Sequence, residues 1–104
     1  MTEEINSKLV KLAKKISDRF NISFEDAEHA DVAKADQNTR ALAVVVGRIK
    51  AIRENRFKPT SPVFGFSRFF GEYNFDRDIY DDACEIENLY SNYFDKLKND
   101  TRSQ

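Results

Sequence analysis

The sequence predicts an all-α fold, a small helical bundle of three main helices over about residues 3–20, 24–56 and 76–98. Three observations favour it. Apolar residues recur at helical spacing in the first and last segments. Glycine and proline occur only at Gly47 and within an aromatic-rich loop over residues 57–75. No other segment reads as a partner strand for the apolar run over 42–46. At this length, residues 1–104 are expected to form a single domain.

The first helix, over about 3–20, is expected to be amphipathic. Its apolar positions are spaced four, three, four and four residues apart, which places them on one helix face. They are Ile5, Leu9, Leu12, Ile16 and Phe20. Asn21 can end this helix in the left-handed conformation, and Ser23 is expected to cap the next one.

The second helix, over 24–56, is the element around which the rest of the chain is organised. We favour a continuous or merely kinked helix. The alternative is a split near 36–38, where Asp36 and Asn38 are acceptable caps. The run over 41–46 is apolar almost all round and must be covered on every side. We therefore expect Val45 or Val46 to be fully buried together with Ile49. A buried strand at this run stays an alternative. Gly47 is expected to mark the close approach of another helix.

We expect this chain to self-associate as a dimer or higher oligomer, and this expectation depends on helix continuity. An unbroken second helix would leave part of the valine run exposed, and a dimer or higher oligomer would cover it most simply. A break near 36–38 would instead let four shorter helices close a bundle within one chain.

The last helix, over about 76–98, is expected to start at Asn74 or Asp76 and to carry a heptad-like apolar seam. The seam consists of Ile79, Ala83, Ile86, Tyr90, Tyr93 and Leu97. In the loop before it, a short helical turn is expected over 67–70, ended by Gly71.

Charge is unevenly distributed, although the net charge is only −1. Residues 38–58 carry a net +5, and residues 76–100 carry a net −5. The first candidate binding surface is the basic helix end with Arg48, Lys50, Arg53, Arg56 and Lys58. We favour pairing of these residues with the acids of the last helix. The alternatives are contacts with phosphates or with an acidic protein partner.

The second candidate surface is the aromatic loop. Its candidate binding residues are Phe64, Phe66, Arg68, Phe69 and Tyr73. We favour a role for these rings in closing the end of the bundle. They could also anchor a protein interface, or stack on bases or a nucleotide together with Arg68.

The residues that could carry chemistry are few. The chain has one cysteine, Cys84, and one histidine, His29, which excludes an internal disulfide and a cysteine-based zinc site. His29 is expected on the solvated surface and Cys84 as a small packed side chain. No nucleophile, base and orienting group converge. We therefore expect no enzyme activity, no cofactor and no metal.

The expected location and function follow from the sequence features described above. No apolar run is long enough to cross a membrane, and the N-terminus lacks a signal-peptide pattern, so a cytoplasmic protein without membrane contact is expected. We expect a small non-catalytic helical protein-binding module that occludes or bridges another protein. Adaptors, assembly factors and inhibitors are of this type, including those that phages or mobile elements encode for a host cytosol. The alternative is a nucleic-acid or nucleotide binder that uses residues 48–58 and the loop with Arg68.

Overall fold

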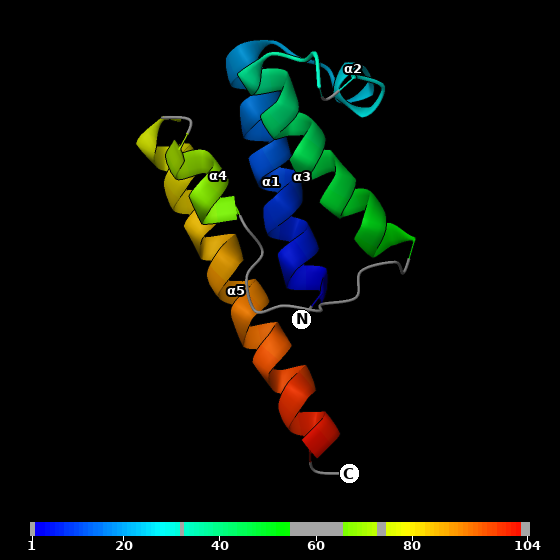
Figure 1. Cartoon of the computed structure of the whole chain (residues 1–104), viewed down its shortest axis with the longest axis vertical. Coiled ribbons are helices and arrows are strands. Elements are labelled where there is room, and N and C mark those ends of the chain that lie inside the picture. Colours follow the sequence, from blue (N-terminus) through cyan, green and yellow to red (C-terminus); the bar gives the residue numbers. More distant parts are fainter. Residues whose placement is uncertain (1, 32, 55–65, 73–74, 103–104) are drawn as a thin grey trace. The chain divides into compact units, whose positions relative to one another are not determined.

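The computed structural model describes residues 2–31, 33–54, 66–72 and 75–102 (Figure 1). In these residues the regular structure is entirely helical, which confirms the all-α prediction and excludes a strand at 42–46. The helices are α1 (Thr2–Phe20), α2 (Phe24–Glu28), α3 (Gln37–Arg53), α4 (Phe66–Glu72) and α5 (Arg77–Arg102).

The chain divides into two compact units. One is Asn6–Phe57, with most of α1, all of α2 and all of α3. The other combines Met1–Ile5 with Lys58–Gln104 and contains α4 and α5. Each unit is described by itself below, and the single domain over 1–104 stays a prediction.

The end of α1 is set by a local hydrogen-bonded turn. Asn21 has a φ of 55°, the left-handed conformation that its position after the apolar stripe predicted. The backbone N–H of Ile22 donates to the carbonyl of Ser17 at 3.1 Å, which closes a Schellman-type turn. The chain then enters α2 at Ser23, whose side chain accepts a hydrogen bond from the backbone N–H of Asp26 at 3.0 Å. The predicted cap is therefore confirmed.

The preference for a continuous or merely kinked helix over 24–56 was wrong, because this segment is split into α2 and α3. The split begins at His29, earlier than the position near 36–38, and ends at Asp36. Asp31 accepts the backbone N–H of Ala33 on its side chain at 3.1 Å. The side chain of Asp36 accepts the backbone N–H of Thr39 at 2.7 Å and caps α3. Aspartates offer the backbone local partners that compete with helix continuation, so the absence of glycine and proline was not decisive.

The core of the Asn6–Phe57 unit is built from α1, α2 and α3. The fully or almost fully buried side chains are Leu9, Leu12, Ala13, Ile16, Ala27, Ala41, Leu42, Val45 and Ile49. Burial of Val45 with Ile49 confirms the packing prediction. Val46 is only half-buried.

Within the described residues, Gly47 does not have its expected role. It is exposed, and a Cβ atom added there would meet nothing within 4 Å. Gly47 therefore marks no helix contact within the described part of the chain.

The other unit contains the packed pair α4 and α5. Phe70 of α4 is fully buried, and its ring meets Phe75 edge to face at a centroid distance of 5.0 Å. Gly71 lies inside α4, so the helix extends beyond the short turn that the sequence predicted. The backbone N–H of Tyr80 donates to the carbonyl of Asp76 at 3.0 Å, which agrees with the predicted start of the last helix. Its apolar seam is buried at Ile79, Ala83, Ile86 and Tyr90, whereas Leu97 is exposed.

Candidate functional site

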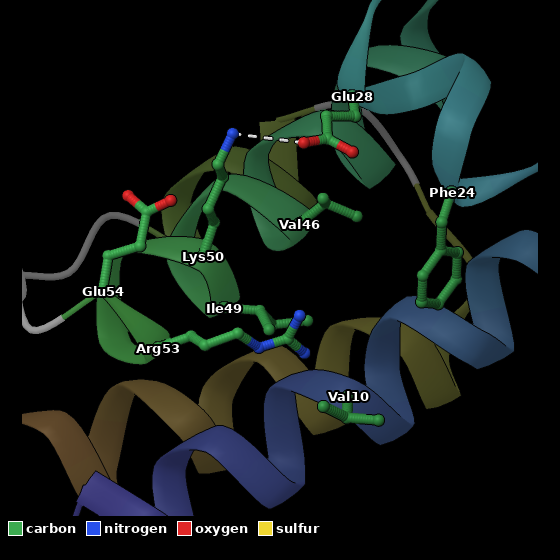
Figure 2. Close-up of a pocket in the computed structure, with 8 residues that line it drawn as sticks. All are labelled: Val10, Phe24, Glu28, Val46, Ile49, Lys50, Arg53 and Glu54. Carbon is green, nitrogen blue, oxygen red and sulfur yellow. Dashed lines mark hydrogen bonds and ion pairs between the residues drawn. The ribbon is translucent and has the colours of Figure 1, made fainter.

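A groove lies on the surface of the Asn6–Phe57 unit, with α1, α2 and α3 each contributing to its walls (Figure 2). Its volume is about 290 Å³, and its lining is mostly apolar. The lining residues are Val10 of α1, Phe24 and Glu28 of α2, and Val46, Ile49, Lys50, Arg53 and Glu54 at the C-terminal part of α3. We refer to this feature as the groove.

The α3 wall follows directly from helical periodicity. Residues three, four and seven positions apart share one face of an α-helix, so Val46, Ile49, Lys50 and Arg53 form a single stripe. Ile49 is buried at the base of this stripe, Val46 is half-buried, and the two cations are exposed. The stripe therefore changes from apolar to basic toward the end of the helix.

The α2 wall is short, and local bonds hold it in place. The Ser23 cap starts the helix, which packs against α3. Glu28 accepts a hydrogen bond from the Lys50 ammonium group at 3.2 Å, and the two side chains are about half exposed (Figure 2). This bridge across the groove ties α2 to α3. Phe24 lies at the groove edge and is 40% exposed.

Arg53 differs from the other charged residues of the groove. Lys50 pairs with Glu28, and Glu54 also has an interaction partner. No ion pair or hydrogen bond involves the Arg53 side chain within the described residues. Figure 2 shows this side chain extended along the groove, with its guanidinium group directed toward Ile49. The groove thus combines an apolar base with one cation available to a ligand.

The remaining predicted binding residues do not gather at the groove. Arg48 lies on α3 outside the lining, and it has an interaction of its own. In the other unit, Arg68 pairs with Glu72 at 3.1 Å on the surface of α4. Phe69 is half-buried and stacks on Phe75 at a centroid distance of 6.3 Å. Arg56, Lys58, Phe64 and Tyr73 lie outside the described residues, as does the side chain of Phe66.

Lys50 of the basic helix end has a different ion-pair partner from the one that the sequence predicted. Lys50 pairs with Glu28 of α2, within its own unit, although the sequence had suggested the acids of the last helix. For Arg48 and Arg56, pairing with those acids stays a prediction, whereas the Arg53 side chain makes no ion pair within the described residues. Exposed charge pairs carry little energy, and any nearby acid can serve as the partner. The charge pattern of the sequence therefore does not determine which acid a given lysine pairs with.

Two further residues that could carry chemistry are His29 and Cys84. His29 is exposed at the end of α2, and no group of three or more metal-ligating side chains lies together in the described ranges. Cys84 is half-buried on α5. A hydrogen bond with Cys84 raises the pKa of Tyr80 above its usual 10.0, and electrostatic interaction with Cys84 adds to this effect. None of the described helices has the length and apolarity needed to cross a membrane.

Sequence reasoning missed most of the groove. Val10 departs from the apolar stripe of the first helix, and an apolar residue on the polar side is a signal that could have been used. Phe24 likewise exposes a large ring in the first turn of α2. The break between α2 and α3 is what brings Phe24 and Glu28 beside the end of α3. A helix continuing past His29 would have carried them away from it.

No family model matches the chain, and the comparisons with curated proteins and with solved structures found no match.

Proposed function

We propose that this chain is a small, non-catalytic helical protein-binding module, and that the groove receives an apolar side chain from a segment of another protein. It acts by occluding or bridging that partner, as an adaptor, assembly factor or inhibitor does. The observation that carries the proposal is the groove itself, with Val46 and Ile49 inside it and Val10 and Phe24 exposed at its edges.

The size of the groove favours a side chain over a cofactor. Its volume of about 290 Å³ lies at the lower limit of the roughly 300–1,000 Å³ typical of small-molecule sites. Apolar anchors in small, well-lined pockets supply much of the binding energy in protein interfaces, and a surrounding polar rim excludes water from them. Lys50, Glu28, Arg53 and Glu54 form such a rim.

The charges of the groove argue against a phosphate ligand. Two cations and two anions line it, so their formal charges cancel. Binding of nucleic acid depends on an excess of cations that neutralise phosphates. Lys50 and Arg48 both have interactions within the protein, which weakens the nucleic-acid alternative for the part of residues 48–58 that the structure describes.

The proposal is tested by selecting peptides from a random dodecapeptide display library on the immobilised protein. Enriched peptides are then measured against Val10→Asp and Phe24→Ala, which alter the groove at exposed positions. Leu97→Asp is the matched control, because Leu97 is 38% exposed and Val10 is 39% exposed. We expect the two groove variants to lose binding while Leu97→Asp keeps it.

A failure of the proposal has a clear form. It is overturned if no peptide is enriched, or if the enriched peptides bind Val10→Asp as well as they bind the wild type. A parallel filter-retention assay with DNA and RNA tests the alternative. Salt-sensitive retention that Arg48→Glu abolishes and Val10→Asp leaves intact would assign the function to the basic helix end.

A further inference from the structure

We propose that the segment bound in the groove is an amphipathic helix with a large apolar side chain and a carboxylate one turn away, and that this carboxylate pairs with Arg53. This inference rests on the proposed function, and it assigns the chemistry of the partner. The partner is another protein, not nucleic acid or a second copy of this chain.

Charge complementarity identifies the carboxylate. Within the described residues, Arg53 is the charged lining residue without an ion pair or hydrogen bond. Its guanidinium group lies beside apolar surface at Ile49 (Figure 2). A guanidinium group is more weakly hydrated than an ammonium group and binds a carboxylate through two parallel hydrogen bonds. A carboxylate is therefore the complementary group that a bound segment can offer there.

The spacing of groove residues along α3 indicates that the bound segment is a helix. Ile49 and Arg53 are four residues apart, a rise of about 6 Å along the helix axis. A helix lying along α3 presents its own side chains at the same spacing, since residues four apart share a face. One apolar side chain can then enter the groove over Val46 and Ile49 while an acid one turn away reaches Arg53. This is the helix-in-groove mode of recognition.

The test uses the strongest peptide that the library selection yields on the wild-type protein. It is synthesised with its acid unchanged, replaced by Gln, and replaced by Lys. Each form is titrated by fluorescence anisotropy against wild type and Arg53→Glu, at low and high salt. Arg68→Glu is the control, because it reverses an exposed arginine of the other unit. Arg53→Glu is expected to fold normally, since Arg53 is exposed.

We expect the Gln peptide to bind the wild type about two- to five-fold more weakly, as for a partly exposed ion pair. The Lys peptide should bind Arg53→Glu more tightly than the acidic peptide does, and high salt should reduce both differences. Arg68→Glu should behave like the wild type.

Two results overturn the inference while leaving the proposed function in place. One is selected peptides that need the groove but carry no acid near their apolar residue. The other is an acid whose replacement changes binding equally in wild type and Arg53→Glu. Light scattering that shows a dimer disrupted by Val10→Asp also overturns it, because the occupant would then be a second copy. Loss of any groove-dependent peptide binding overturns the proposed function itself.

Discussion

Replacing Gly47 by alanine should stabilise the protein. Gly47 lies in the interior of α3, more than one turn from either end, and an added Cβ atom would meet nothing within 4 Å. Glycine costs a helix interior about 0.5–1 kcal/mol relative to alanine, because the unfolded chain loses more freedom on folding. The added methyl group would contact no other atom within 4 Å, so no steric clash offsets this gain. Gly47→Ala should therefore raise the free energy of unfolding by about 0.5–1 kcal/mol.

For a chain of this size, that gain corresponds to a rise in melting temperature of roughly 2–8 °C. Urea unfolding followed by circular dichroism measures the free energy, and a thermal scan checks it. Gly71→Ala is the matched control. Its Cβ atom would lie 3.3 Å from the Tyr80 ring, and Gly71 is one residue from the end of α4, so a smaller gain or none is expected.

The reasoning is refuted if Gly47→Ala is destabilised. That outcome would mean that something packs against Gly47 in solution. A destabilisation that grows with protein concentration would identify this contact as a second copy crossing at Gly47. It would support the dimer that an all-round apolar helix first suggested.

Three further predictions concern the core, a cap and an ion pair. Val45→Asp should unfold the protein, because Val45 is fully buried and an unpaired buried charge costs several kcal/mol, whereas Val10→Asp should retain the wild-type circular dichroism spectrum. Hydrogen bonds from Thr39 lower the pKa of the Asp36 carboxyl group below its usual 3.8. The stabilisation that this cap gives the folded protein is therefore fully present above pH 3.8, and it is lost as the pH falls through the lower pKa of the folded state. Asp36→Asn keeps a capping acceptor without this titration and should lose less stability in acid melts; equal acid losses would contradict the assignment. A double-mutant cycle on Glu28 and Lys50 should give a coupling of about 0.2–1 kcal/mol that shrinks in high salt, and zero coupling at low salt would show that the bridge does not hold α2 to α3.

The elements with strong periodicity could be predicted from the sequence. The stripe of α1 from Ile5 to Ile16 and the seam of α5 as far as Tyr90 are buried as their spacing requires, whereas Phe20 is half-buried. Local chemistry also sufficed at Asn21 and Ser23, where one residue determines the backbone conformation or the cap. These features depend on neighbours within one helical turn, so the sequence carries the necessary information.

The rest depended on competition between weak local preferences. Asp31 lies just after the end of α2 and Asp36 caps α3, and the side chain of each accepts a local backbone hydrogen bond in a stretch that lacks glycine and proline. The groove then arises from this break, since it places α2 against α3. Arg53 was among the predicted binding residues. Val10 and Phe24, which line the groove together with Arg53, could not be assigned to the same site before the break was known.

The central claim is that the groove is the binding surface, and nuclear magnetic resonance tests it most directly. Methyl- and ¹⁵N-labelled protein is titrated with the strongest peptide from the library selection. We predict that the largest chemical-shift changes occur at Val10, Val46 and Ile49, with Leu97 unchanged. Changes centred on Leu97 or on the aromatic residues of α4 and α5, with Val46 and Ile49 unaffected, would contradict the claim.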